Sequence, residues 1–215
     1  MIVKEIFAII LGYLLGSLPS AYIATRLATG KDIRQMGGGS VGGQNVYREV
    51  GAWSALAVGI VDLSKGAAAV AIAYWLLDLS PLFVLLTGLA AVIGHNWMVW
   101  IRFSGGKGMG STIGALSVLF PVYGYWQGLP IIFGVIIIPY LITRNIALSM
   151  CIFLVALPFI TWLGMHSGVG TIMAIILGLV AGIKFLPTAR AAWAKVESKS
   201  DFFFDQWQRN KKERE

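Results

Sequence analysis

The chain has 215 residues, of which 57% are hydrophobic and 13% are charged, with a formal net charge of +7. Soluble domains carry about 25% charged residues, so this composition excludes an ordinary soluble domain and predicts a protein that is solvated largely by lipid. Cys151 is the single cysteine, which excludes an intramolecular disulfide and offers no metal-ligand spacing.

Apolar segments predict seven membrane-spanning helices within residues 1–187. The segments are Ile6–Thr25, Ala52–Leu77, Leu79–Ile101, Gly108–Thr143 and Asn145–Ile183. One bilayer crossing needs about 20 residues, so the last two segments are each long enough for two crossings. Clusters of Pro, Gly and aromatic residues predict their turns at Pro121–Trp126 and Gly164–Gly170. We therefore expect an all-α membrane protein.

Basic residues predict which side of the membrane each connection faces. They fall in the first, third and fifth connections and in the tail, whereas the opposite connections carry little beyond Lys4, Glu5 and Asp78. The basic residues of the three connections are Arg26, Lys31, Arg34, Arg48, Arg102, Lys107 and Arg144. The positive-inside rule then predicts an N-terminus outside and a cytoplasmic C-terminus. Topology and anionic lipid account for the positive charge, so we expect no nucleic-acid partner.

Residues 188–215 predict a separate cytoplasmic tail of basic and aromatic character. Its apolar residues at helical spacing are Ala189, Ala192, Trp193 and Val196, and the aromatic residues that follow amid mixed charge are Phe202, Phe203, Phe204 and Trp207. Such a pattern is typical of a helix that lies in the headgroup layer.

The first cytoplasmic connection contains a glycine-rich loop. Five of the seven residues from Gly37 to Gly43 are glycines, and Ser40, Asn45 and Arg48 lie among or just after them. Closely spaced backbone N–H groups bind oxyanions, and an arginine adds a bidentate grip. The alternative is a flexible glycine linker. Since every long polar connection faces the cytoplasm, the predicted active site lies at the cytoplasmic edge of the membrane.

The second predicted span carries two ionisable residues, Asp62 and Lys65. They are three residues apart, so they lie on one helical face and can form an ion pair. Ionisable residues inside a membrane are costly and therefore candidates for function. A structural pair that supports the cytoplasmic loops is an equal alternative.

The third cytoplasmic connection contains Gly105-Gly106-Lys107-Gly108, at the predicted start of a helix. Glycines let backbone N–H groups approach an anion, and the lysine adds a positive charge. The nucleotide-binding pattern G-x-x-x-x-G-K-[ST] is absent, so we expect a different phosphate site. The alternative is a basic turn that follows the positive-inside rule. His95 precedes this loop, and we place it about two turns before its helix ends. The alternative for His95 is a structural role, in which its ring is hydrogen-bonded to a neighbouring carbonyl.

The ordered set of these motifs resembles a known family. The motifs are Gly16-Ser17-Leu18-Pro19-Ser20-Ala21-Tyr22, Lys31-Asp32-Ile33-Arg34, the glycine loop with Asn45 and Arg48, Asp62-x-x-Lys65-Gly66, Gly94-His95, and Gly105–Gly108. Over roughly residues 10 to 150 they resemble the bacterial acyl-phosphate-dependent glycerol-3-phosphate acyltransferases, which are seven-span inner-membrane enzymes. The resemblance implies acyl transfer from acyl phosphate to the 1-hydroxyl of glycerol 3-phosphate, giving lysophosphatidic acid. It implies no coenzyme A, metal or other cofactor.

The resemblance also implies roles for individual residues. Lys107 and Arg48 would hold phosphate, Asn45 would line the same pocket, and His95 would lie beside it. Together with the loop chemistry, this predicts His95 and Ser40 as catalytic residues. The predicted phosphate-binding residues are Gly39, Asn45, Arg48, Gly105, Gly106, Lys107, Arg144 and Ser149.

Three positions depart from the family pattern. Gly38 and Ala147 stand where the family carries serine, and Phe185–Thr188 stands where it carries His-Arg-x-Asn. Losing one donor to a bound charged group costs about 1.5–3 kcal/mol. The alternative function is therefore a catalytically impaired paralogue that binds a phosphorylated lipid precursor or a partner subunit. A small transporter is disfavoured, because the outer connections are nearly free of polar residues.

Overall fold

The computed structural model describes residues 2–193 of the chain. These residues fold into helices and short connections without a β-strand, apart from one isolated bridge between Met98 and Ser104. This confirms the prediction of an all-α protein. The chain forms two compact units, which divide between Tyr123 and Gly124.

The first unit contains six helices and two short 3-10 turns among its described residues. The α-helices are α1 (Ile2–Gly16), α2 (Ser20–Thr29), α3 (Gly43–Glu49), α4 (Ala52–Ala71), α5 (Pro81–Asn96) and α6 (Met109–Val122). The 3-10 turns are η1 (Ile33–Gln35) and η3 (Val99–Ile101), and a π-helical turn, η2 (Ile72–Leu76), extends α4. The predicted span Ile6–Thr25 is interrupted near Pro19, because proline has no N–H to continue a helix.

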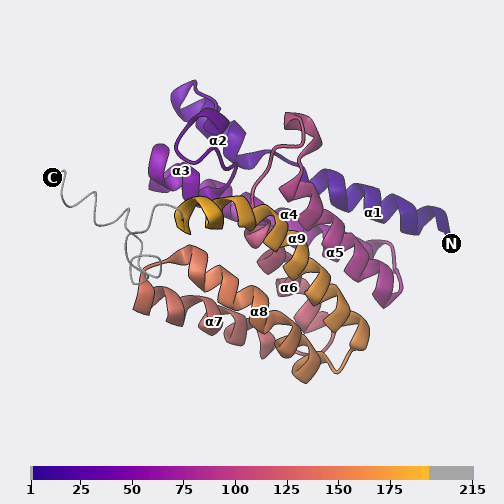
Figure 1. Ribbon diagram of the computed structural model, residues 1–215. Coiled ribbons are helices and arrows are strands. Elements are labelled where there is room, and N and C mark those ends of the chain that lie inside the picture. Colours follow the sequence, from indigo (N-terminus) through magenta and orange to yellow (C-terminus); the bar gives the residue numbers. More distant parts are fainter. Residues whose placement is uncertain (1, 194–215) are drawn as a thin grey trace. The chain divides into compact units, whose positions relative to one another are not determined.

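The helices of the first unit pack at very short backbone distances. Figure 1 shows α1 running alongside α5, and α4 packs in the same way on α6. A Cβ atom at Gly16 would overlap the carbonyl of Ala91, and one at Gly66 would overlap the carbonyl of Ser111. Small residues at helix interfaces allow this approach, which is common in membrane proteins.

The second unit contains α7 (Gly128–Thr143), α8 (Ile146–Met165) and α9 (Gly168–Trp193). Within this unit α8 contacts both α7 and α9. The helix boundaries confirm the two turns predicted near Pro121–Trp126 and Gly164–Gly170. Helix α9 continues past residue 188, and residues 194–215 lie outside the described part, so the interfacial helix of the tail stays a prediction.

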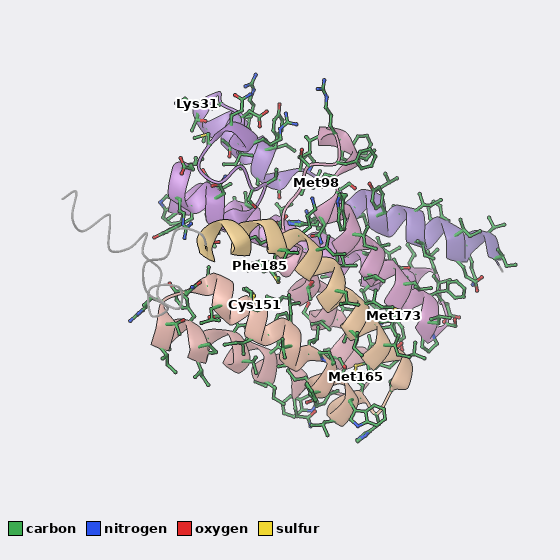
Figure 2. All side chains as sticks on the ribbon, viewed as in Figure 1. Lys31, Met98, Cys151, Met165, Met173 and Phe185 are labelled. Atoms are coloured by element: carbon green, nitrogen blue, oxygen red, sulfur yellow. The ribbon has the colours of Figure 1, made fainter. Side chains whose placement is uncertain are left out.

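Among residues 2–193, seven apolar helical stretches correspond in order to the seven predicted spans. Four are long and apolar enough to cross a membrane, namely Ile2–Thr29, Ala52–Leu76, Leu148–Met165 and Gly168–Leu186. Three others, Pro81–Asn96, Met109–Val122 and Gly128–Thr143, are shorter. Large apolar side chains such as Trp53, Ile142 and Val155 project outward, while Lys31 lies where nitrogen and oxygen atoms gather near α2 (Figure 2). The number of crossings and their orientation stay predictions.

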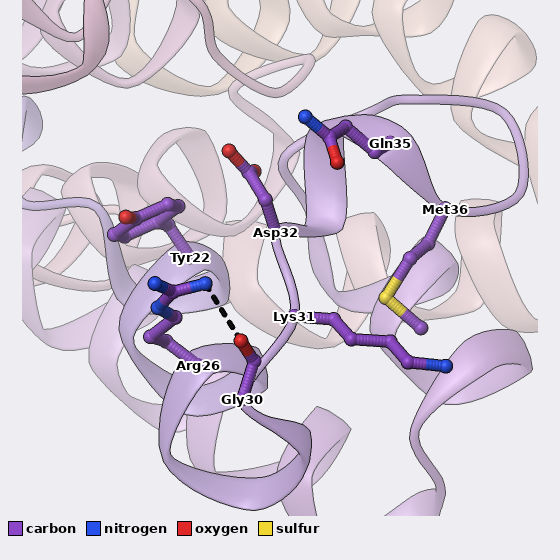
Figure 3. Close-up of a pocket in the computed structure, with 7 residues that line it drawn as sticks. All are labelled: Tyr22, Arg26, Gly30, Lys31, Asp32, Gln35 and Met36. Atoms are coloured by element: carbon purple, nitrogen blue, oxygen red, sulfur yellow. Dashed lines mark hydrogen bonds between the residues drawn. The ribbon is translucent and has the colours of Figure 1, made fainter.

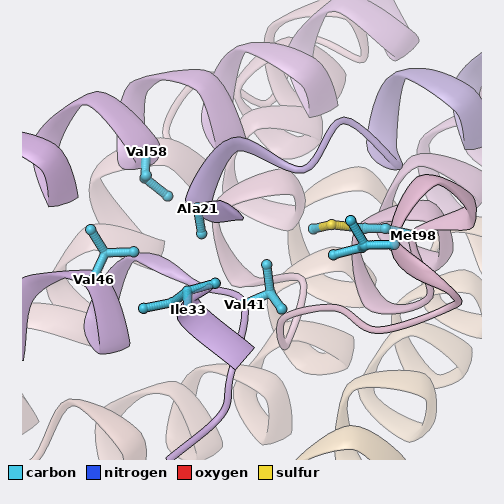
Figure 4. Packing of buried hydrophobic residues seen from close by; sticks show 7 residues of the cluster. Ala21, Ile33, Val41, Val46, Val58 and Met98 are labelled. Carbon is cyan, nitrogen blue, oxygen red and sulfur yellow. The ribbon is translucent and has the colours of Figure 1, made fainter. Parts of the chain in front are cut away.

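An apolar cluster fixes the loops of the first unit on the start of α4. Ala21, Ile33, Val41, Val46, Val58, Met98 and Ile101 are all buried and pack together (Figure 4). These residues come from α2, η1, the glycine loop, α3, α4 and the segment that follows α5. The cluster therefore holds the first and third connections against each other.

Candidate active site

Asn45 lies in the first turn of α3, and its side chain forms hydrogen bonds that hold the first glycine loop in place. Its side-chain Nδ2 donates to the carbonyls of Met36 and Ser40, each at 3.0 Å, and its Oδ1 accepts from the amide of Gly38 at 3.3 Å. The Asn45 side chain is buried. Because these bonds occupy the amide, Asn45 holds the loop in shape rather than presenting its polar atoms to a ligand.

Some positions of this loop require glycine, and others do not. Gly37 has a φ of +52°, and a Cβ there would lie 2.5 Å from Glu49 Oε1. Gly39 has a φ of +68°, which L-residues rarely adopt. By contrast, a Cβ at Gly38 would have no neighbour within 4 Å. The loop therefore has space for a side chain at residue 38, where the family carries serine.

The second glycine loop packs directly on His95. The amide of Gly106 donates to the carbonyl of His95 at 3.1 Å. A Cβ at Gly106 would overlap His95 Nε2 and would lie 2.8 Å from the carbonyl oxygen of Val41. Since Val41 belongs to the first glycine loop, both loops meet at Gly106, which lies against the imidazole of His95.

His95 lies in the last turn of α5, which ends at Asn96. Our expectation that it lies two turns before the helix end is therefore wrong. The helix ends here because Trp97 leaves the helical conformation, with φ −135° and ψ 75°. The His95 side chain is 4% exposed, and its Nδ1 lies 3.5 Å from Asp62 Oδ1.

Asp62 and Lys65 form the predicted ion pair, with 2.9 Å between Lys65 Nζ and Asp62 Oδ1. Ser20 also donates to Asp62 Oδ1 at 2.7 Å, and Lys65 donates to the carbonyl of Leu18 at 3.1 Å. The sequence did not predict the hydrogen bond from Ser20 to Asp62 or the position of His95 beside Asp62. Ser20 falls in the Gly16–Tyr22 motif, which was the only signal for it.

The two predicted phosphate-holding cations belong to the same compact unit. Arg48 lies in the last turn of α3, and Lys107 lies in the second glycine loop, one residue before the N-cap of α6. Both side chains are partly buried. Partial burial strengthens the attraction between these cations and an anion.

Asp32 and Arg34 tie the first connection to the third. Arg34 Nη2 lies 2.6 Å from Asp32 Oδ2, and Arg34 Nη1 donates to the carbonyl of Ile101 at 3.3 Å. The hydrogen bond from Arg34 lowers the pKa of the Asp32 carboxyl group. The Arg34 guanidinium also stacks over the ring of Tyr22, at 5.5 Å from its centroid. This pairing is structural support for the loops.

A cavity of about 550 Å³ opens beside the C-terminal end of α2 (Figure 3). It is lined by Tyr22, Arg26, Gly30, Lys31, Asp32, Gln35 and Met36. Arg26 Nη1 donates to the carbonyl of Gly30 at 2.6 Å, so this arginine also closes the end of its helix. None of the predicted catalytic or phosphate-binding residues lines this cavity.

Arg144 and Ser149 lie in the second compact unit, at the connection between α7 and α8. Arg144 has a left-handed backbone conformation, with φ +55°. Ser149 is buried, and its hydroxyl donates to the carbonyl of Asn145 at 3.1 Å. Their predicted roles in phosphate binding stay predictions. Among residues 2–193, no group of three or more His, Cys, Asp and Glu side chains could hold a metal ion.

The apolar helices define an integral membrane protein with a polar, glycine-rich region in its first unit. The chain belongs to the glycerol-3-phosphate acyltransferase family, whose model matches residues 6–194. The resemblance seen in the motifs is thereby confirmed.

Individual relatives agree with this family. The chain is 49% identical over 202 residues to "Glycerol-3-phosphate acyltransferase 1" of Dehalococcoides mccartyi, covering 94% of this chain and 97% of that protein. It is 41% identical over 151 residues to a glycerol-3-phosphate acyltransferase of Synechococcus sp. (strain JA-3-3Ab), covering 70% and 71% of the two chains.

A solved structure shares the fold. It is the crystal structure of PlsY (YgiH), described as an integral membrane glycerol 3-phosphate acyltransferase in its glycerol 3-phosphate form. The TM-score is 0.75 at 25% identity, and the match covers 89% of this chain and 92% of that chain.

Proposed function

We propose that this protein transfers an acyl group from acyl phosphate to the 1-hydroxyl of glycerol 3-phosphate, at the cytoplasmic face of a bacterial inner membrane. The products are lysophosphatidic acid and inorganic phosphate, which makes the reaction a step of phospholipid synthesis. The observation that carries this proposal is the meeting of both glycine loops beside His95, in a chain 49% identical to a protein named as a glycerol-3-phosphate acyltransferase.

The proposed chemistry needs few protein groups. Acyl phosphate is an activated mixed anhydride, so the hydroxyl oxygen of the acceptor attacks the acyl carbon and the bond from that carbon to the phosphate oxygen breaks. The hydroxyl proton passes to a phosphate oxygen of the substrates. Catalysis then depends on holding two anions in the right orientation and on stabilising their charge.

Particular residues of the first unit suit these tasks. Lys107 and Arg48 supply the positive charge for the two phosphates, and the backbone N–H group of Gly105 supplies a neutral donor. The amides of Gly39 and Gly106 already donate to the carbonyls of Met36 and His95, so these two glycines shape the loops around the phosphates. Ser40 follows Gly39 in the first loop, where its hydroxyl replaces the donor lost at Gly38. His95 lies between the loops, where its imidazole helps to orient the substrates beside the phosphate site.

The alternative of a catalytically impaired paralogue is not favoured. Its basis was the absence of serine at residues 38 and 147, yet a relative named as a glycerol-3-phosphate acyltransferase matches 94% of this chain at 49% identity. The loop of this chain also has space at residue 38, so it accommodates either a glycine or a serine there.

The full chain, purified in detergent, tests this proposal with palmitoyl phosphate as donor. Glycerol 3-phosphate is the acceptor, glycerol is the control acceptor, and palmitoyl coenzyme A is the control donor. We expect phosphate release and lysophosphatidic acid only with palmitoyl phosphate and glycerol 3-phosphate together. Use of palmitoyl coenzyme A instead would overturn the proposed donor, and the absence of any transfer would revive the impaired paralogue.

A further inference from the structure

A carboxylate buried in an apolar helix requires an explanation. Asp62 lies in α4, within a stretch apolar enough to cross a membrane, and its side chain is 7% exposed. An ionised group in such a place is costly, and proteins keep one where it has a partner and a task. The partner that sequence spacing does not reveal is His95, which comes from the end of α5.

Three groups converge on one oxygen of this carboxylate. Asp62 Oδ1 accepts from Ser20 at 2.7 Å and from Lys65 at 2.9 Å, and it lies 3.5 Å from His95 Nδ1. Lys65 is held in turn by the carbonyl of Leu18. The Lys65 ammonium balances the charge of the carboxylate, and the hydrogen bonds to Ser20 and to the Leu18 carbonyl hold the pair in one position.

The protonation of the imidazole follows from this arrangement. An ionised carboxylate only accepts hydrogen bonds, so a ring nitrogen beside it is favoured when that nitrogen carries a proton. We infer that Asp62 is a positioning residue for His95: it keeps the proton on Nδ1, so that the unprotonated Nε2 faces the second glycine loop. A neutral imidazole in this tautomer presents Nε2 as an acceptor.

The opposite edge of the ring faces the glycine loops. Nε2 lies against Gly106 so closely that a Cβ there would overlap it, and the carbonyl of Val41 lies nearby. Asp62 on one side and the Gly106 backbone on the other prevent the ring from turning. The inferred tautomer therefore places His95 Nε2, as a hydrogen-bond acceptor of known orientation, at the point where both loops meet. That this acceptor serves the substrates rests on the proposed function.

The same contacts would also occur in a purely structural network. Ser111 donates to the backbone carbonyl of Asp62 at 3.2 Å, so the region joins α6 to α4 as well. A purely structural role predicts lower stability when the network is broken, with unchanged turnover per folded molecule. A positioning role predicts a change in the tautomer of His95 and in the pH dependence of turnover.

Nuclear magnetic resonance measures the tautomer directly. The chain contains two histidines, so His166→Gln leaves His95 as the only one. Two-bond ¹H–¹⁵N spectra of the ¹⁵N-histidine-labelled full chain in detergent are recorded well above the pKa of a free imidazole, about 6.5. We expect a protonated Nδ1 and an unprotonated Nε2. The opposite tautomer in this variant would overturn the inference without any change at Asp62.

Removal of Asp62 tests the cause of the preference. Asp62→Leu alone would leave Lys65 as an unpaired buried charge, so we combine it with Lys65→Met, since replacing both members of a buried pair is often tolerated. We expect both tautomers to be populated in this double variant. Asp32→Asn is the control, because Asp32 pairs with Arg34 and not with His95. An unchanged tautomer in the double variant would contradict the positioning role.

Kinetics of the same variants separate positioning from structural support. We expect the double variant to lose about tenfold or more in kcat, with the KM for glycerol 3-phosphate changed little and the pH profile shifted. A lower melting temperature and less folded protein, with normal kcat per folded molecule, would show that Asp62 has a structural role only. The tautomer is measured without substrate, so failure of the proposed function leaves the spectroscopic result standing.

Discussion

The two glycine loops of the first unit look alike in composition but require glycine for different reasons. In the loop from Gly37 to Gly43 the chain turns on positive φ angles and is held by Asn45, while Gly38 faces open space. In the loop from Gly105 to Gly108 the backbone lies against other groups, including the imidazole of His95. The first loop is therefore held in shape by its own hydrogen bonds, whereas the second loop positions the side chain of His95.

Removing the charge of Lys107 from the second loop should reduce kcat/KM more than removing the hydroxyl of Ser40 from the first loop. We expect Lys107→Ala to reduce kcat/KM by about 10³-fold, because the phosphates of both substrates would lose their compensating charge, and Ser40→Ala to reduce it by about 10- to 100-fold. Steady-state phosphate release measures both. Arg102→Gln, an exposed cation of the same connection, is the control for net charge. Wild-type turnover in Lys107→Ala would refute the site.

Adding a methyl group to one glycine of each loop should affect kcat differently, because a Cβ has space at Gly38 but not at Gly106. Gly106→Ala places its Cβ on His95 Nε2, so we expect a loss of about 100-fold or more in kcat as the ring or the loop is displaced. Gly38→Ala is the matched control, with no atom within 4 Å of the new Cβ. We expect it to stay within about twofold of wild type, as surface substitutions usually do. Similar losses in both variants would show that the loops do not differ in this way.

The shape of the first loop should depend on Asn45. Asn45→Asp keeps the size of the side chain but replaces a donor to Met36 and Ser40 with an acceptor, which leaves two carbonyls unpaired. We expect a lower melting temperature, from a loss of about 1–3 kcal/mol, and a higher KM for glycerol 3-phosphate. Thermal unfolding in detergent and initial rates measure the two effects. An unchanged KM would separate the loop from substrate binding.

Hydropathy was sufficient to predict the helices, because apolar length and turn residues are local properties. The turns before Gly128 and Gly168 were predicted correctly for this reason. The break near Pro19 was missed although the proline was visible, since the apolar run continues through it. Three helices are shorter than the predicted spans, and sequence alone does not fix where a connection begins.

The candidate site was predictable only where it depends on short spacing. The pair of Asp62 and Lys65 followed from helix periodicity and is confirmed. The contact of Asp62 with His95 depends on how α4 packs beside α5, which no spacing rule encodes. The hydrogen bonds by which Asn45 holds the first loop were not predicted either, because they depend on the path of the loop around its side chain.

The smallest effect should come from restoring a serine to the first loop. The open space at residue 38 accommodates a serine side chain, so we expect Gly38→Ser to fold normally and to raise kcat/KM by about two- to threefold, through one added donor near the phosphates. Initial rates at low glycerol 3-phosphate concentration are the sensitive measurement. A tenfold loss would show that the loop is closed at this position when substrate is bound.

The central claim is that phosphate binds where both glycine loops meet His95. Titration of the ¹⁵N-histidine-labelled His166→Gln chain with glycerol 3-phosphate tests it most directly. We expect a saturable change in the Nε2 signal of His95, no change with glycerol, and loss of the response in Lys107→Ala. If the protein transfers acyl groups to glycerol 3-phosphate while its His95 signals stay unchanged at saturation, phosphate does not bind beside His95.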